Sequence, residues 1–347
     1  MGNRKQEMNI LPPPASIIRE ELHRREKQSL SKFAALSENT KGRERHSPPC
    51  ELRTEYQRDR DRIIHCKSFR RLTHKTQVFL SPEGDHYRTR LTHTLEVCQI
   101  ARTVARALRL NEDLTEAIAL GHDLGHTPFG HTGEGVLDQL SPHGYIHAEQ
   151  SVRLAQRLEN GGKGLNLTWE VRDGILHHSS GKPAATLEGR LVRYADKIAY
   201  LNHDIDDAVR AGVLTHGDIP QILQEELGRT VSERITFFVT ALVNGSGEDI
   251  KMPDRAQQLY DELRGFMFGS VYTNPAAKKE DEKAKMVVQR LYEYYTGNPG
   301  ALPPEYAVIA RESDVSRAVC DYISGMSDRF CISTFEDIFV PKAWGSS

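Results

Sequence analysis

The chain has 347 residues, 38% hydrophobic and 27% charged, which is the composition of a folded globular protein and argues against disorder as its overall state. Its formal net charge of −2 excludes a global electrostatic attraction to nucleic acid or to an anionic membrane surface. No apolar run approaches the roughly 18 residues of a membrane span, and the five cysteines form no CxxC pair. We therefore expect a cytoplasmic protein with no membrane partner and no disulfide framework.

Residues 1–55 are expected to form an N-terminal arm and linker, because they hold a proline triplet, a charged segment and the stretch NTKGRERHSPPC. From about Tyr56 the pattern changes. The segment RDRDRIIHCKSFRRLTHKTQVF spaces apolar residues among basic ones, which predicts a helix with one buried stripe and a short extended exit at KTQVF. We assign residues 56–212 to the core and residues 213–347 to a C-terminal helical region packed on that core.

Two amphipathic helices are predicted next. In LTHTLEVCQIARTVARALRL the apolar residues recur at spacings of three and four, which predicts a helix that begins near Thr92. The following segment, NEDLTEAIALGHDLGH, is predicted to be a helix that is capped by Asn111 and ends near Gly125, since Pro128 follows soon after.

Helical periods continue to the end of the chain. A long helix is predicted over residues 187–212, and shorter ones over 149–159 and 169–179. After Gly212 the same pattern recurs in ERITFFVTALVNG, RAQQLYDELRGFMF, KAKMVVQRLYEYYTG and DVSRAVCDYISGMSDRF. Convincing alternating strands are scarce, so the predicted class is all-α, and no GxxxxGK[ST] phosphate-binding loop is present.

Two histidines and two aspartates are candidate metal ligands. His93 and His122 fall on the inward faces of their predicted helices, Asp123 follows directly, and Asp196 lies beside the apolar stripe of the long helix. A lone inward histidine is often a hydrogen-bonded core residue, but a buried carboxylate costs several kcal/mol unless it is paired or bound to a cation. If the four side chains converge, they supply N and O ligands to one divalent ion and leave positions open for water or phosphate.

The order His93, His122-Asp123, Asp196 resembles the H…HD…D signature of the HD-domain metal-dependent phosphohydrolases. The segments HDLGHTPFGHTGE, FRRLTHKTQVF, RTRLTHTLEV, YADKIAYLNHDIDDA and DYISGMSDRF together resemble the deoxynucleoside triphosphate triphosphohydrolase branch, from about Tyr56 to Phe339. This resemblance implies an HD-domain helical core with additional C-terminal helices. It also implies one divalent ion (Mg, Mn or another transition metal) and hydrolysis of dGTP, or of dNTPs generally, to deoxynucleoside and inorganic triphosphate.

The resemblance further implies a catalytic group formed by His126, His131 and Glu134. His126 lies one turn after His122 if the helix persists that far, and the family places it near the phosphates. His131 lies beyond Pro128 on an irregular stretch and corresponds to the catalytic group at the α-phosphate. Glu134 opens the next helix, where it can orient His131 through a hydrogen bond or simply be a carboxylate favoured by the helix dipole.

Substrate contacts are implied at five further positions. Arg90, one helical turn before His93, and Lys197, next to Asp196, correspond to phosphate contacts. The deoxyribose contacts are implied at Gln77, Tyr200 and Asp204, and the last two share a helix face with Asp196. Phe69 and Val78 are candidates for the base pocket, although nothing in the sequence identifies the base. Ala148 stands where many members carry Asn, which leaves the surroundings of His147 open.

The basic run from Arg58 to Lys75 has alternative interpretations. It is typical of a solvated helix face or a subunit contact, but it also suits a nucleotide effector or single-stranded nucleic acid. A homo-oligomer is expected from the resemblance. The competing functions are another HD-type nucleotide phosphohydrolase, such as a 5′-nucleotidase or a phosphodiesterase, and a nucleotide or nucleic-acid binding regulator with little turnover.

Overall fold

The computed structural model describes residues 15–77, 88–273 and 275–342, so Val78 lies outside the described residues. Across these ranges the ordered elements are helices, and the only β-type pairings are two isolated bridges, Arg43 with Thr168 and Thr76 with Thr89. The predicted all-α class is therefore confirmed. Within the same ranges, none of the helices combines the length and apolarity needed to cross a bilayer.

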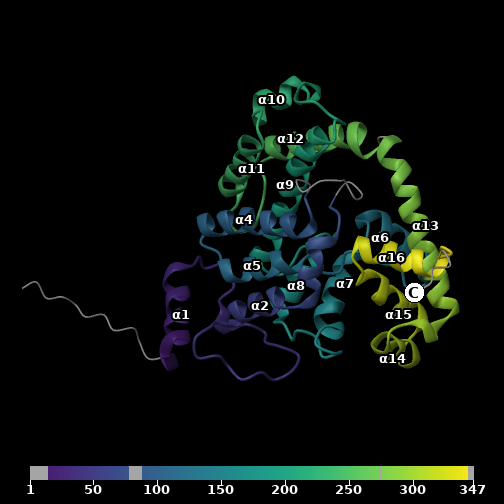
Figure 1. Ribbon diagram of the computed structural model, residues 1–347. Coiled ribbons are helices and arrows are strands. Elements are labelled where there is room, and N and C mark those ends of the chain that lie inside the picture. Colours follow the sequence, from purple (N-terminus) through teal and green to yellow (C-terminus); the bar gives the residue numbers. More distant parts are fainter. Residues whose placement is uncertain (1–14, 78–87, 274, 343–347) are drawn as a thin grey trace, which may run out of the picture.

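Five helices form the central stack: α2 (Glu55–Ile64), α4 (Arg90–Leu108), α5 (Glu112–Gly121), α8 (Trp169–His177) and α9 (Leu187–Arg210). Figure 1 shows α2, α5 and α4 at successive levels, with α9 packed across α4 and α5. The remaining α-helices are α1 (Ala15–Ser29), α3 (Lys67–Arg71), α6 (Gly130–Leu140), α7 (His147–Arg153), α10 (Gln221–Leu227), α11 (Val231–Gly245), α12 (Asp254–Met267), α13 (Pro275–Gly297), α14 (Pro304–Glu312), α15 (Val315–Ser324) and α16 (Asp328–Phe339).

The central helices share one hydrophobic core. The predicted stripe of α4, which includes Val97, Ile100 and Val104, is almost completely buried and belongs to one cluster with Ile118 of α5 and Ile198 of α9. This burial explains why the α4 sequence carries apolar residues at helical spacing, because only one face of the helix meets the core. The side chain of Asn111 accepts the N–H of Leu114 over 3.1 Å, so the predicted cap of α5 is confirmed.

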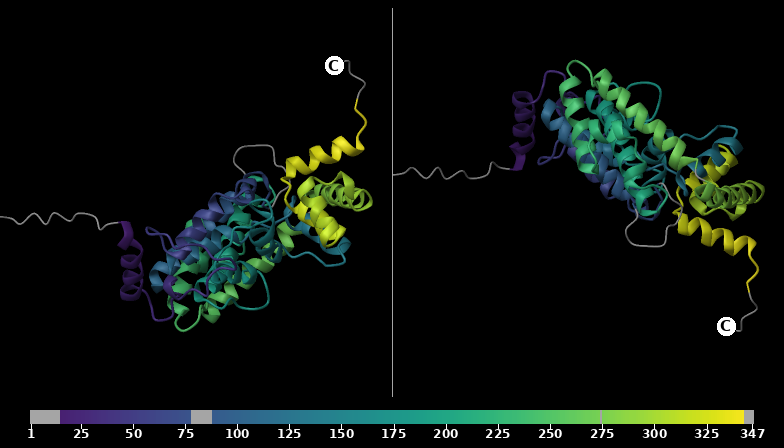
Figure 2. Two further views of the ribbon diagram at one scale, coloured as in Figure 1. Left: turned by 90° about the horizontal axis from the view of Figure 1, so that it is seen from below. Right: turned by 90° about the horizontal axis from the view of Figure 1, so that it is seen from above.

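A second hydrophobic cluster lies at one end of the molecule. It joins Phe129 and Leu137, at the start and on the inner face of α6, to Val288 of α13 and to Val319 and Ile323 of α15. Figure 2 shows these C-terminal helices at the end of the molecule opposite α1. Helix α6 directly follows α5 of the central stack in the sequence, but in space it packs on the C-terminal helices.

Two of the predicted helices are interrupted. The segment after Tyr56 forms α2 and α3 rather than one helix, because the chain turns at His65 and the Cys66 side chain caps α3 by accepting the N–H of Phe69 over 3.3 Å. The segment 314–330 forms α15 and the start of α16, and Ser327 caps the second helix by accepting the N–H of Phe330. Both interruptions are capped by local hydrogen bonds that compete with continued helix.

The basic run from Arg58 to Lys75 makes intramolecular contacts. Arg58 and Arg62 both donate to the hydroxyl of Ser47, and Arg62 also donates to the carbonyl of Asn166 over 2.6 Å. Lys75 is buried, and its ammonium donates to the carbonyls of His126 and Ser324 over 2.5 and 2.7 Å. These cations therefore hold distant segments of the same chain together.

Candidate metal and catalytic site

The four predicted metal ligands meet between α4, α5 and α9. His93 lies on α4, His122 and Asp123 lie in the turn that directly follows α5, and Asp196 lies on α9. Oδ1 of Asp196 is 3.1 Å from Nε2 of His93 and 3.8 Å from Nε2 of His122, and Oδ1 of Asp123 is 3.4 Å from Nε2 of His122. The structure therefore brings all four side chains together.

The donor set fits a divalent cation. Nδ1 of His122 donates to the carbonyl of Ala119 over 2.6 Å, which leaves a lone pair on Nε2, and this buried nitrogen has no hydrogen-bond partner among the described residues. Burial opposes the ionisation of Asp123, yet the nearby His122, His126 and Arg90 outweigh it and hold the pKa of Asp123 well below its usual range. A buried carboxylate that stays ionised beside an unpaired imidazole nitrogen is the arrangement that a bound cation satisfies.

The turn after α5 is shaped by a close backbone contact. Helix α5 ends at Gly121, so the predicted end near Gly125 is wrong, and the chain leaves the helical path to lie against α7. A Cβ atom on Gly125 would lie only 2.7 Å from the carbonyl oxygen of His147, and the N–H of Gly125 donates to the hydroxyl of Ser151 over 2.8 Å. Only glycine permits this approach.

Helix α5 ends before His126, so His126 reaches the site from the turn that follows the helix. Its Nε2 lies 3.4 Å from Oδ1 of Asp123, and its ring stacks on that of His147 with centroids 4.0 Å apart. Burial and the neighbouring Arg90 hold the pKa of His126 well below its usual range. His126 is therefore a neutral imidazole beside the predicted ligand set.

His131 and Glu134 form a hydrogen-bonded pair on α6. The helix begins at Gly130, after Phe129 and Gly130 adopt left-handed backbone angles, so His131 lies in its first turn and the expectation of an irregular stretch there is wrong. Oε2 of Glu134 accepts from Nδ1 of His131 over 3.0 Å, and the side chain of His131 is 70% exposed. This hydrogen bond occupies Nδ1, so Nε2 is the ring nitrogen of His131 that can exchange a proton with another group.

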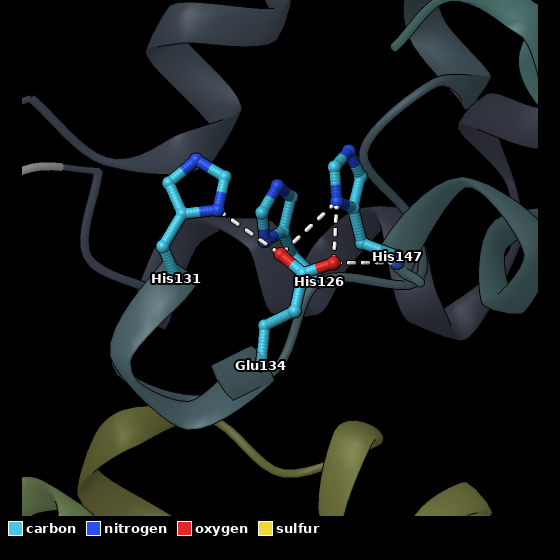
Figure 3. Close-up of side chains that lie close together, drawn as sticks. All are labelled: His126, His131, Glu134 and His147. Carbon is cyan, nitrogen blue, oxygen red and sulfur yellow. Dashed lines mark hydrogen bonds and ion pairs between the residues drawn. The ribbon is translucent and has the colours of Figure 1, made fainter. Parts of the chain in front are cut away.

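Glu134 also holds a second imidazole, that of His147 (Figure 3). Its Oε1 accepts from Nδ1 of His147 over 2.9 Å and from the backbone N–H of the same residue over 2.8 Å. Burial opposes the ionisation of Glu134, but the hydrogen bonds from His131 and His147 hold its pKa far below the usual range. Burial likewise opposes the protonation of His147, but Glu134 outweighs it and raises the pKa of His147.

Sequence reasoning missed the side chains of His147 and His178 as members of the site. His178 follows α8 as His122 follows α5, and its Nδ1 likewise donates to a carbonyl three residues earlier, that of Ile175, over 2.7 Å. Burial, together with the nearby His122 and His147, lowers the pKa of His178 to about 4. A histidine directly after an apolar helix end was the signal that could have identified this residue.

A cavity of about 370 Å³ opens beside the ligand set. Four of the predicted substrate residues, Gln77, Arg90, Lys197 and Tyr200, line it together with His93, Asp123, His126, His131 and Asp196. One wall was not foreseen. It is formed by α12 and the turn after it and contributes Gln257, Tyr260, Asp261, Arg264 and Phe268.

Asp204 and Phe69 do not line this cavity in the described part of the chain. Asp204 is fully buried behind Tyr200, where its carboxylate accepts a hydrogen bond from the hydroxyl of Tyr272, whose ring stacks on Tyr200 with centroids 5.7 Å apart. Burial raises the pKa of Asp204 to about 7. Phe69 packs in the central hydrophobic core.

Comparison with known proteins identifies two family domains in the chain. Residues 90–201 match the HD domain, and residues 250–337 match the phosphohydrolase-associated domain. The fold is similar to that of a phosphohydrolase from Bacteroides thetaiotaomicron, with a TM-score of 0.50 at 17% identity over 78% of this chain and 66% of that chain.

Two curated relatives cover nearly the whole chain, and both are named deoxyguanosinetriphosphate triphosphohydrolase-like protein. The relative from Caldanaerobacter subterraneus subsp. tengcongensis is 54% identical over 94% of this chain and 97% of its own length. The relative from Desulfatibacillum aliphaticivorans is 49% identical over 93% of this chain and 98% of its own length. At this identity and coverage, the chain belongs to the family of deoxyguanosinetriphosphate triphosphohydrolase-like proteins and is a hydrolase of the HD-domain class.

Proposed function

We propose that the protein hydrolyses deoxynucleoside triphosphates, dGTP among them, to the deoxynucleoside and inorganic triphosphate, with one divalent metal ion held by His93, His122, Asp123 and Asp196. The observation that carries this proposal is that His131, held by Glu134, borders the same cavity as three of the four proposed ligands, His93, Asp123 and Asp196. The names of the curated relatives support the substrate class. When bound, the divalent ion supplies Lewis-acid polarisation and a lowered pKa of coordinated water.

The cavity offers cations for a polyphosphate chain. Arg90, Lys197 and Arg264 all line it. Because the sequence has no GxxxxGK[ST] phosphate-binding loop, these three cationic side chains are proposed to bind the phosphates of the substrate. The Arg90 guanidinium already donates to Asp123 over 2.9 Å, so it spans the predicted ligand set and the phosphate end of the cavity. Lys197 is an exposed residue, and the partial desolvation of its ammonium group, together with Arg193 and Arg264, lowers its pKa.

His131 is proposed as the proton-transfer group at the α-phosphate. Attack of water at the α-phosphorus breaks its bond to the 5′-oxygen, and that oxygen leaves the phosphate as a deoxynucleoside hydroxyl only when it receives a proton. Glu134 fixes Nδ1 of His131 as the inner nitrogen, so Nε2 is the one available to the substrate. His126, neutral and buried, is proposed to lie beside the phosphates.

Tyr200 is proposed to pack against the deoxyribose, and Gln77 to bind its hydroxyl, because both line the cavity. Oε1 of Gln77 is buried without a partner among the described residues, so it is available for a substrate hydroxyl. Asp204 is proposed to act behind this wall by holding Tyr272 against Tyr200. A homo-oligomer, a nucleotide effector and a contact with single-stranded nucleic acid remain predictions.

The deciding experiment incubates the full chain with each dNTP and Mg²⁺ or Mn²⁺ and resolves the phosphate products. We expect inorganic triphosphate and deoxynucleoside in equal amounts. Release of pyrophosphate or of single phosphates contradicts the proposed reaction, and turnover of monophosphates or cyclic nucleotides alone supports another HD-type phosphohydrolase. The Asp196→Ala protein, prepared identically, controls for contaminating phosphatases.

A further inference from the structure

Asp328, the first residue of α16, joins the C-terminal helices to two segments that carry residues of the cavity wall. Its Oδ1 accepts the backbone N–H of Phe129 over 2.9 Å. Its Oδ2 accepts the backbone N–H of Thr76 over 2.8 Å and also the hydroxyl of the same residue. Asp328 is buried, with 5% of its surface exposed, and a carboxylate offers only acceptors, so these donors use both of its oxygens.

The contact with Phe129 holds a strained turn just before His131. Phe129 has a left-handed backbone with a φ of 62°, which costs free energy in a residue other than glycine and persists only where the surroundings fix it. Its buried N–H precedes the first turn of α6 and has no partner within that helix, so Asp328 satisfies this donor. His131 follows two residues later, and the direction in which α6 starts determines where its imidazole lies.

The contact with Thr76 holds the segment that carries Gln77. The start of α4 is tied to the same segment, because the N–H of Arg90 donates to the carbonyl of Lys75 over 3.0 Å. The two segments that Asp328 holds also lie against each other, since a Cβ atom on Gly130 would lie 3.7 Å from the carbonyl oxygen of Gln77. One carboxylate therefore fixes two borders of the cavity at the place where they meet.

We propose that Asp328 is a positioning residue of the hydrolysis reaction, which sets Gln77 against the sugar and His131 at the α-phosphate. The roles of these two residues come from the proposed function, so the proposal rests on it. Asp328 does not line the cavity in the described part of the chain, and it acts through the two segments that it holds. The segment DYISGMSDRF thereby gains a part in the reaction, because its aspartate completes the site from the C-terminal helices.

Asp328→Asn tests this role in the full chain. The substitution keeps the size of the side chain but replaces one oxygen by an amide nitrogen, which cannot accept a hydrogen bond from either segment. We expect the variant to bind as much Mn²⁺ as the wild type, with kcat lower and KM for dGTP higher by about tenfold each, the effect of one hydrogen bond to a charged group. Thr76→Val removes only the hydroxyl donor, so it should raise KM by about tenfold and leave kcat unchanged.

Asp321→Asn is the matched control. Asp321 lies on α15 and is similarly buried, and its carboxylate binds Arg153 and Gln150, which do not line the cavity in the described part of the chain. This variant is expected to lose stability without a change in kcat or KM. Equal kinetic losses in the two variants, or wild-type kinetics in Asp328→Asn, overturn the proposal.

A second measurement does not depend on turnover. In histidine-labelled protein, the imidazole ¹⁵N signals of His131, assigned by their loss in His131→Ala, are expected to move in Asp328→Asn and to stay unchanged in Asp321→Asn. Unchanged signals in folded Asp328→Asn overturn the proposal. A wild type that hydrolyses no dNTP contradicts the proposed function, and the ¹⁵N comparison then decides by itself whether Asp328 positions His131. Should Asp328→Asn fail to fold by circular dichroism, Thr76→Val carries the test, and a KM equal to that of the wild type overturns the proposal.

Discussion

Arg90 donates a hydrogen bond from Nη1 to Oδ2 of Asp123 over 2.9 Å, at a place where only 2% and 4% of the two side chains are exposed. Both charges are removed from bulk water, so each stabilises the other only while the pair is intact. We expect Arg90→Met to lower the free energy of unfolding by about 3 kcal/mol, since it leaves a buried carboxylate without its partner. Guanidinium unfolding with and without Mn²⁺ measures this loss.

Added Mn²⁺ is expected to recover part of the stability of Arg90→Met, because the cation supplies the missing positive charge near Asp123. The matched control is Arg106→Met. Arg106 pairs with Glu112 but is 72% exposed, so no measurable change is expected there. Equal behaviour of the two variants would show that the buried pair contributes no more than a surface pair.

Loss of His131 is expected to separate chemistry from metal binding. His131→Ala should retain the metal content of the wild type but lose activity by about 10²–10⁴-fold, the usual effect of removing a general acid or base. Steady-state kinetics and metal analysis of the same preparation measure both quantities. His143→Ala is the control and should be fully active. His143 does not line the cavity, and its Nε2 lies 3.1 Å from Oδ2 of Asp314. Full activity of His131→Ala would show that its assigned role is wrong.

Removal of Asp196 is expected to abolish metal binding and activity together, because its carboxylate contacts both His93 and His122. Calorimetric titration of the Asp196→Ala protein with Mn²⁺ and a dNTP hydrolysis assay test this prediction. Asp249→Asn is the control, since Asp249 is 62% exposed and its ion-pair partner is Arg190, on the surface. Retained activity in Asp196→Ala would exclude it as a required ligand.

Asp204 is expected to make stability depend on pH. Its folded pKa of about 7 lies above the value of about 3.9 in an unfolded chain, so the folded state binds the proton more tightly. The resulting stability is fully present below pH 4 and is lost as the pH rises toward 7. The asparagine side chain in Asp204→Asn cannot ionise. The free energy of unfolding of this variant relative to the wild type should therefore increase by about 4 kcal/mol between pH 4 and pH 7, and this difference should stay constant above pH 7.

Denaturant unfolding of both proteins at half-unit pH intervals gives this difference directly, because all other titrating groups are common to the two chains. Parallel stability curves across the interval would show that burial does not raise the pKa of Asp204. Tyr272→Phe, which removes the hydroxyl that donates to Asp204, is expected to raise the pKa further and to move the interval to higher pH.

Gly125→Ala is expected to destabilise the protein by about 3 kcal/mol or more, because the added methyl group meets the backbone of α7 rather than a flexible side chain. Gly135→Ala is the control. Gly135 lies inside α6 with open space around its Cα, so alanine should stabilise that helix by about 0.5–1 kcal/mol. Thermal unfolding of both variants measures the contrast, and a neutral Gly125→Ala would contradict the close approach.

Much of the helical framework could be predicted because apolar side chains recur with the period of the helix, as in α4 and α9. The four metal-ligand candidates were accessible for the same reason, since His93 and Asp196 lie on or beside these inward faces. The helix ends were less accessible. The early end of α5 depends on how Gly125 packs on α7, and the sequence around Gly125 does not contain that contact.

The remainder of the site depends on contacts between segments that are distant in the chain. His147 and His178 stand in different helical regions, and no spacing rule relates them to each other or to Asp123. The wall formed by α12 is another example, because Arg264 and Phe268 reach the cavity only through tertiary packing. Asp204 shares a helix face with Tyr200, as expected, but its hydrogen bond with Tyr272 could not be predicted.

Lys75 connects the turn beside the cavity to the C-terminal helices. Its single ammonium group donates to the carbonyl of His126, in the turn that carries His122 and Asp123, and to the carbonyl of Ser324, the last residue of α15. One buried side chain therefore fixes the position of the end of α15 relative to the turn that carries His126. The C-terminal helices therefore contribute to the position of the histidine turn through the two hydrogen bonds of Lys75.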